Sequence, residues 1–246
     1  SKARGEVMSK HGLQHRGLIR RGKILRSAVK LFLEKGYAST TTPEIMKATG
    51  MSASSFFAAF KDKEALLLTL VGQMFESQFK NAGSLPCADI DPLMLYAMET
   101  ALQMHITELS EPLRELYVTA YTLTSTAEYI HQNTAKKLSA IFHLYQPNAT
   151  EKDFYELELA SSGVTRSYMA KPCDMYFPME QKLRRYLGCC FRIYDVPREK
   201  YEPVIEAVLR TDLHTEAEKI IAETVAKAEA GFEALLEETQ PHHGSL

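Results

Sequence analysis

The amino-acid sequence predicts an all-α protein, and three observations support this fold class. Apolar residues recur every three or four positions through most of the 246 residues, which is the spacing of one face of a helix. Turn signals built from Gly, Pro and Asn separate these segments at intervals typical of helical bundles. No segment has the pattern of a convincing strand, and the phosphate-binding pattern GxGxxG does not occur.

Residues 40–63, TTTPEIMKATGMSASSFFAAFKDK, form the segment whose residue order predicts a specific geometry. Thr42 and the proline after it are expected to be the N-cap and first residue of a short helix, because the fixed φ of proline suits a position whose N–H needs no partner. Gly50 is expected to end this helix in the left-handed conformation. Ser52 then caps a second short helix over residues 53–60. Two short helices joined by a glycine turn predict a helix-turn-helix, whose second helix enters the DNA major groove.

The run from Gly22 to Leu68 resembles the DNA-binding domain of TetR-family transcriptional regulators. In that family a first helix ending in Gly-aromatic precedes the helix-turn-helix, and here it is ILRSAVKLFLEKGY, residues 24–37. The family's recognition stretch usually reads Gly-Val-Ser, then Gly or Ser, a small polar residue, Tyr, His-Phe and Lys-x-Lys-Glu. The corresponding residues here are Gly50, Met51, Ser52, Ser54, Ser55, Phe57, Ala59, Phe60, Lys61, Lys63 and Glu64. The resemblance implies an N-terminal three-helix helix-turn-helix domain followed by a larger helical-bundle regulatory domain.

Two residues depart from the family's pattern at positions that contact phosphate. Phe57 stands where the family usually has a tyrosine, and Ala59 stands where a histidine is frequent, so both donors are absent. Ala53 offers no long donor to a base edge, which leaves direct readout to short hydroxyls and to apolar contacts with thymine methyl groups. The residues predicted to contact DNA are Thr42, Ser52, Ala53, Ser54, Ser55, Phe57, Lys61 and Lys63. The missing donors favour an alternative, a TetR-like fold that acts as a protein-interaction module with weak or no specific DNA binding.

The distribution of charge agrees with a DNA-binding N-terminal segment. Residues 1–63 contain 13 Lys and Arg against 4 Asp and Glu, whereas the remainder contains 16 against 27. The formal net charge of −2 hides this asymmetry. A basic segment attached to an acidic body is typical of a protein that binds a polyanion with one of its parts.

A domain boundary is expected near residue 80, where the polar, proline-containing stretch NAGSLPCADIDP interrupts the helical period. Residues 1–20 are basic and lack periodicity, so we expect a flexible arm along the DNA. A remnant of expression cloning, suggested by the missing initiator Met, and plain disorder are the alternatives. The expected organisation is this arm at 1–20, a DNA-binding domain with its connecting helix at 21–80, a ligand-binding and dimerisation domain at 81–240, and a tail at 241–246.

The helical body contains one candidate pocket. Flexible methionines and aromatic rings with a few hydroxyl and imidazole groups are typical of sites for a small apolar or amphipathic effector. The same residues at helical spacing also suit an ordinary core, which is the alternative. The candidate effector-binding residues are Met94, Met98, His105, Tyr117 and Tyr121. The family resemblance implies that the connecting helix transmits ligand occupancy to the recognition helices.

The helix predicted over residues 178–194 carries a large apolar and aromatic face that has to be covered. In TetR-like proteins the late helices typically pair with those of a second subunit, so the resemblance implies a homodimer. A two-fold dimer also suits a palindromic operator, whose half-sites lie about 34 Å apart. The candidate dimerisation residues are Tyr186, Leu187, Cys190, Phe191 and Tyr194. An intramolecular core is the alternative for this face.

Other patterns disfavour other classes of protein. HExxH, GxSxG and other local catalytic signatures are absent, so we expect no enzyme, no cofactor and no metal site. The four cysteines, Cys87, Cys173, Cys189 and Cys190, lack CxxC or zinc spacing and are expected to be reduced thiols. No apolar run of about 18 residues and no signal-peptide pattern occurs, which predicts a soluble cytoplasmic protein. The favoured interpretation is a DNA-binding transcriptional regulator, an effector-responsive repressor that binds a palindromic operator as a homodimer.

Overall fold

The computed structural model describes residues 2–83 and 91–237. This part of the chain forms eleven α-helices and, apart from one isolated bridge between Asp174 and Phe177, contains no β-structure. The all-α prediction is therefore confirmed. Cys87, most of the stretch predicted to separate the domains, and the predicted tail at 241–246 lie outside the described residues.

Contacts along the chain divide it into two compact units. Unit 1 comprises Ser1–Leu66 and Ala222–Leu246, and unit 2 comprises Leu67–Ile221. The division falls inside α4 (Lys63–Gly83) and inside α11 (Leu213–Glu237), so each of these helices belongs to both units. The sequence-based boundary near residue 80 lies later along α4 than this division.

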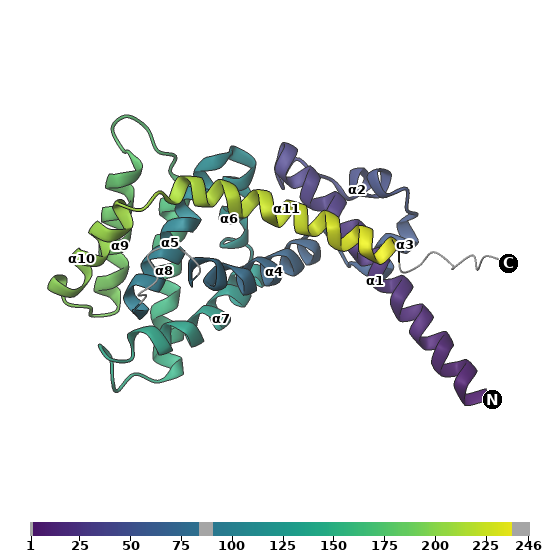
Figure 1. Cartoon of the computed structure of the whole chain (residues 1–246), viewed down its shortest axis with the longest axis horizontal. Coiled ribbons are helices and arrows are strands. Elements are labelled where there is room, and N and C mark those ends of the chain that lie inside the picture. The colour runs from purple at the N-terminus through teal and green to yellow at the C-terminus, as the bar shows by residue number, and fades with distance from the viewer. Residues whose placement is uncertain (1, 84–90, 238–246) are drawn as a thin grey trace. The chain divides into compact units, whose positions relative to one another are not determined.

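Unit 1 is built on α1 (Lys2–Lys35), α2 (Thr42–Thr49), α3 (Ala53–Ala59) and the first turn of α4 (Figure 1). Helix α1 packs against both short helices. The buried core consists of Ile24, Ala28 and Phe32 from α1, Ile45 from α2, Phe56 from α3, and the following Phe60 and Leu66. The apolar stripe that the sequence shows along the first helix is therefore part of this core.

Residues 2–20 are helical and continue α1, which differs from the expected flexible arm. This segment contains three glycines, each of which destabilises a helix by about 1 kcal/mol relative to alanine. It contains no proline, however, and it is otherwise rich in Lys, Arg, Met, Gln and Leu, which have high helix propensity. Local propensity therefore extends the helix even though apolar periodicity is missing.

The N-cap of α2 is Thr41, and Thr42 is the first helical residue, so the predicted cap was wrong by one position. The reason is a capping box. Thr41 Oγ1 accepts a hydrogen bond from the Glu44 N–H at 3.4 Å, and the Glu44 carboxylate accepts one from the Thr41 N–H at 2.8 Å. Gly50 ends the helix with φ of 65°, and Ser52 caps α3, both as predicted. The helix-turn-helix is thus fixed by local signals.

Unit 2 is a helical bundle arranged around α5 (Pro92–Leu109). Five other helices pack against α5 (Figure 1): α6 (Glu111–Ala120), α7 (Thr124–Phe142), α8 (Glu151–Ala170), α9 (Met179–Ile193) and α10 (Arg198–Leu209). Because so much of its surface is covered, α5 is buried on several faces and tolerates a nearly continuous apolar sequence.

The apolar face of α9 lies in the core of unit 2 rather than at a subunit contact. Tyr186, Leu187, Cys190, Phe191 and Tyr194 are all 0% exposed within the single chain. Tyr194 stacks on Phe142 with ring centroids 4.2 Å apart, and Phe191 stacks on Tyr201 at 5.5 Å. The prediction that these five residues form the dimer interface was therefore wrong, because neighbouring helices of the same chain already cover them. The alternative, an intramolecular core, is what the structure contains.

A buried ionic junction joins the ends of α5, α6, α8 and α9. The fully buried Lys182 ammonium donates to Glu108 Oε1 at 2.8 Å and also to the Lys171 carbonyl. Arg114 pairs with the other Glu108 oxygen at 3.0 Å and donates to the Met169 carbonyl at 2.9 Å. Burial raises the pKa of Glu108, but hydrogen bonds from Arg114 and Lys182 outweigh it and lower that pKa to about 2. The junction therefore holds an ionised carboxylate in place.

Candidate functional site

Helix α3, the second helix of the helix-turn-helix, presents an uncharged face to the outside. Phe56 is buried, whereas the neighbouring Phe57 is 50% exposed, and the two rings meet edge to face at 5.1 Å. Among the residues predicted to contact DNA, Thr42 and Ser55 are partly buried, and the exposed ones are Ser52, Ala53, Ser54, Phe57 and Lys61. This face consists of short hydroxyls, methyl groups and one ring, and it carries no long hydrogen-bond donor of the kind that reads a base edge.

Two interactions hold the short helices on α1. Arg21 donates from Nη1 to the Ala59 carbonyl at 2.6 Å, and its guanidinium lies 4.3 Å from the centroid of the Phe60 ring. Lys35 at the end of α1 forms an ion pair with Glu44 of α2. The first interaction fixes the C-terminal end of α3, so the exposed face of that helix has a defined orientation within unit 1.

Lys63 is engaged inside unit 1, which argues against its predicted role at the DNA backbone. Its ammonium donates to the Tyr37 carbonyl at 2.8 Å and to the Thr40 carbonyl at 3.0 Å. The same ammonium lies 4.1 Å from the centroid of the Tyr37 ring. Lys63 therefore connects the start of α4 to the segment between α1 and α2. Of the two lysines predicted to contact DNA, Lys61 is the exposed one.

A basic groove of about 340 Å³ lies beside α1 in unit 1. Lys23, Arg26 and Lys30 line it from α1, together with Glu34, and Ala48 lines it from α2. Three cations against one carboxylate make this surface attractive to phosphate groups.

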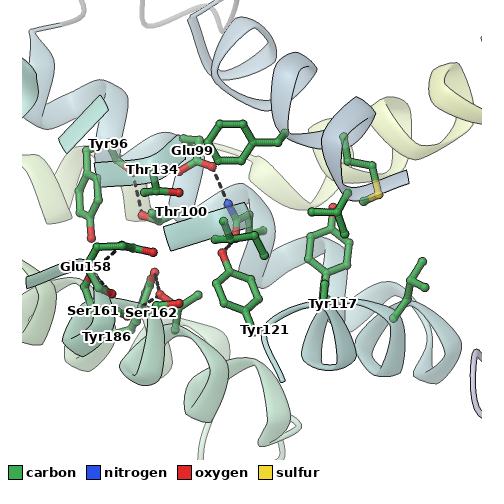
Figure 2. A pocket seen from close by; sticks show the side chains of 18 of the residues that line it. Tyr96, Glu99, Thr100, Tyr117, Tyr121, Thr134, Glu158, Ser161, Ser162 and Tyr186 are labelled. Carbon is green, nitrogen blue, oxygen red and sulfur yellow. Dashed lines mark hydrogen bonds between the residues drawn. The ribbon is translucent and has the colours of Figure 1, made fainter. Parts of the chain in front are cut away.

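Unit 2 contains a cavity of about 70 Å³ lined by residues from α4, α5, α6, α7, α8 and α9 (Figure 2). Much of the lining is aromatic: Phe75, Tyr96, Tyr117, Tyr121 and Tyr186. Four lining residues lie on α4, namely Leu67, Val71, Met74 and Phe75. A molecule larger than the available space would have to displace some of these side chains.

Two carboxylates extend into this cavity, Glu99 from α5 and Glu158 from α8 (Figure 2). Their residues are only 4% and 3% exposed. Glu99 Oε1 accepts from Gln103 Nε2 at 2.5 Å, and Gln103 Oε1 in turn accepts from the Tyr121 hydroxyl at 3.1 Å. Burial raises the pKa of Glu99 to about 7, although the hydrogen bond from Gln103 and the positive charge of Lys137 act in the opposite direction.

Glu158 has several polar neighbours but is still destabilised as an anion. Ser161 Oγ donates to Glu158 Oε2 at 3.1 Å, and His131 Nδ1 lies 3.5 Å from Oε1. Burial raises the pKa of Glu158 in spite of the lowering effect of His131 and Ser161. The negative charge of Glu158 also raises the pKa of Glu99, so the two carboxylates repel each other across the cavity.

The structure brings two of the five predicted effector-binding residues to the cavity. Tyr117 and Tyr121 line it, whereas Met94, Met98 and His105 do not. Met98 is buried in the core. Burial, followed by the electrostatic effect of His214, lowers the pKa of His105 to about 4. The sequence signal that was missed is a polar stripe in an otherwise apolar helix, at the helical spacing of Tyr96, Glu99, Thr100 and Gln103.

Within residues 2–83 and 91–237, no helix combines the length and the apolar composition needed to cross a lipid bilayer.

Comparisons with known proteins agree with the helix-turn-helix. The family profile described as bacterial regulatory proteins, tetR family, matches residues 24–70. The uncharacterized HTH-type transcriptional regulator YuxN of Bacillus subtilis is 29% identical over 154 residues, which are 59% of this chain and 52% of YuxN. TcmR of Streptomyces glaucescens is 37% identical over 67 residues, or 27% of this chain and 30% of TcmR.

Two further comparisons are with a regulator of Staphylococcus aureus and with a solved structure. QacR of Staphylococcus aureus, an HTH-type transcriptional regulator, is 26% identical over 127 residues, or 50% of this chain and 68% of QacR. The solved structure of Salmonella enterica GusR matches 71% of this chain and 95% of its own, with a TM-score of 0.48 and 19% identity, a likeness too low to support an inference. The match to YuxN spans about half the length of that protein. Residues 24–70 therefore match the helix-turn-helix domain of the tetR family of bacterial regulatory proteins.

Proposed function

We propose that this protein is an effector-responsive transcriptional repressor that binds a palindromic DNA operator as a homodimer. The observation that supports this most directly is the course of α4. Lys63, in its first turn, is hydrogen bonded to the helix-turn-helix unit, and residues from Leu67 to Phe75 on the same helix line the cavity of unit 2. One continuous helix therefore carries both a residue bound to the helix-turn-helix unit and four residues of the cavity lining.

The proposed DNA contacts are the exposed face of α3 and the cations around it. Ser54 faces base edges, and the Lys61 ammonium and the groove at Lys23 and Lys30 face phosphates. The absence of the tyrosine and histidine donors at Phe57 and Ala59 places more of the affinity on these cations. Binding is accordingly expected to depend steeply on salt.

The proposed switch is a shift of α4 on ligand binding. An effector in the cavity favours the conformer in which Leu67, Val71 and Met74 are displaced, and the first turn of α4 moves with them. A coupling of about 1 to 3 kcal/mol between the two sites changes DNA affinity roughly 5- to 150-fold. In a dimer, such a shift of α4 weakens DNA binding, because the two recognition helices must match half-sites about 34 Å apart.

The test is fluorescence anisotropy with DNA flanking the protein's own gene and with a scrambled DNA of equal length, over a range of salt concentrations. We expect selective binding that persists at about 150 mM salt. Lys61→Ala should weaken binding to both DNAs and reduce the salt slope by about one. Lys152→Ala, an exposed lysine on α8, is the matched control and should leave the slope unchanged.

Equal affinity for the two DNAs would contradict the operator-binding proposal. That result would favour the protein-interaction module, with the missing phosphate donors at Phe57 and Ala59 as the physical cause.

A further inference from the structure

We infer that the cavity of unit 2 selects a lipophilic organic cation, held between the Glu99 and Glu158 carboxylates and against the surrounding tyrosine rings. The inference rests on the proposed function only in taking this cavity as the effector site. It adds the chemical class of the ligand, which follows from the charge and the shape of the lining.

The geometry of the lining places two negative groups in one apolar space. Glu99 comes from α5 and Glu158 from α8, and both extend into the cavity (Figure 2). The lining residues, among those that the structure describes, include no Lys and no Arg. The rings of Tyr117, Tyr121 and Tyr186 provide the aromatic faces that attract an organic cation.

The protein supplies these carboxylates with neutral hydrogen-bond donors, so a cationic ligand can still neutralise their charge. Gln103 gives Glu99 a neutral donor at 2.5 Å, and Ser161 gives Glu158 one at 3.1 Å. Lys137 and His131 add positive potential, yet burial still makes both carboxylates unfavourable as anions. A cation bound between them supplies the missing countercharge, whereas an anion would face two carboxylates in a medium that screens poorly.

A neutral ligand gains less from this arrangement than a cation does. It buries the same apolar area against the rings, but it leaves the repulsion between Glu99 and Glu158 uncompensated. The lining therefore predicts that a cation binds more tightly than a neutral or anionic molecule of the same shape. This difference in affinity can be measured directly.

Isothermal titration calorimetry with the full chain tests this with two ions of matched shape and opposite charge, tetraphenylphosphonium and tetraphenylborate. We expect the cation to bind at least roughly tenfold more tightly than the anion. Benzyltrimethylammonium is measured in parallel, because its smaller size requires less expansion of the cavity. Charge-independent binding, or no binding of either cation, would overturn the inference.

Variants locate the effect in the cavity. Glu99→Gln and Glu158→Gln keep the side-chain volume and remove the charge, and each should weaken tetraphenylphosphonium binding by roughly tenfold. Glu156→Gln on the exposed side of α8 is the matched control and should not change the affinity. Circular dichroism of each variant confirms that it is folded. Unchanged affinity in both folded cavity variants would also overturn the inference.

Release of DNA separates this inference from the proposed function. Charge-selective cation binding that leaves DNA affinity unchanged upholds the inference and contradicts the effector role. Release of DNA by a neutral compound, together with no cation binding, upholds the effector role and overturns the inference.

Discussion

Lys63 occupies a motif position that predicts a DNA contact, but its ammonium makes hydrogen bonds within unit 1. Its ammonium hydrogen bonds to the Tyr37 and Thr40 carbonyls, so Lys63→Met leaves the Thr40 carbonyl without its donor, while the Tyr37 carbonyl keeps the Thr40 N–H at 3.2 Å. Hydrogen bonds from a charged donor contribute about 1.5 to 3 kcal/mol each, and we expect a loss of about 2 kcal/mol in the free energy of unfolding. Urea denaturation measures it, with Lys61→Met as the exposed control. A stability equal to that of the control would show that these hydrogen bonds contribute little.

Glu99 should make the proposed binding of a cation depend on pH. With a pKa raised to about 7, this carboxyl is largely neutral at pH 6 and largely ionised at pH 8, so tetraphenylphosphonium should bind more tightly as pH rises through 7 and should release protons on binding. The charged and titratable groups that face Glu99 or its partner are Glu158 on α8, Lys137 and His131 on α7, Tyr117 on α6, Tyr121 just after it, and Tyr186 on α9.

Calorimetry between pH 5.5 and 8.5, in buffers of different ionisation enthalpy, measures both quantities. Glu99→Gln should remove most of the pH dependence, and Glu156→Gln should preserve it. The same raised pKa means that the free protein loses stability as pH rises from about 4.5 through 7, because the folded state binds the proton more tightly than the unfolded state. An affinity that falls with rising pH would contradict the role assigned to Glu99.

At the scale of whole helices, the Glu108 junction connects α5 to α9. Lys182→Met removes the buried ammonium, leaves the Lys171 carbonyl without its donor and should lower the free energy of unfolding by about 3 kcal/mol. Arg184→Met on the exposed side of α9 is the control, and its surface ion pairs with Glu180 and Glu206 should contribute about 0 to 1 kcal/mol. Equal losses in chemical denaturation would show that burial does not distinguish the two sites.

The Glu108 carboxylate adds a pH dependence to this junction. Its folded pKa of about 2 lies below the usual value, so its contribution to stability is present above about pH 4.5 and is lost as pH falls toward 2.

Elements fixed by local chemistry could be predicted from the sequence, and elements fixed by packing could not. The glycine turn at Gly50 and the Ser52 cap are short-range signals, and both were predicted. The polar stripe through Glu99 was missed because α5 is covered on several faces, so its apolar periodicity does not show which face lines a cavity. The aromatic face of α9 was assigned to a partner because an amphipathic pattern shows that a face is covered without showing what covers it.

At the scale of the whole molecule, the proposed homodimer needs a surface other than the buried face of α9. The outer side of α8 is a candidate, because Leu159 is 44% exposed there and is followed by the exposed small residues Ala160, Gly163 and Ser167. Small residues let a second helix approach closely, and a two-fold axis would place this surface against itself. The dimer proposal thus moves from α9 to its neighbour α8.

Gly163 offers a sharp test of this surface. A Cβ atom at this position would meet no other atom within 4 Å, so Gly163→Ala fits the isolated chain, and the longer side chain of Gly163→Arg starts from an exposed position. Across a two-fold interface, however, Gly163→Arg would place two cations near each other and should raise the dimer dissociation constant by at least roughly tenfold, with a parallel loss of operator affinity. Sedimentation equilibrium measures the first effect, and Gly163→Ala should remain dimeric. An arginine variant that stays as dimeric as the alanine variant would place the subunit contact elsewhere on the molecule.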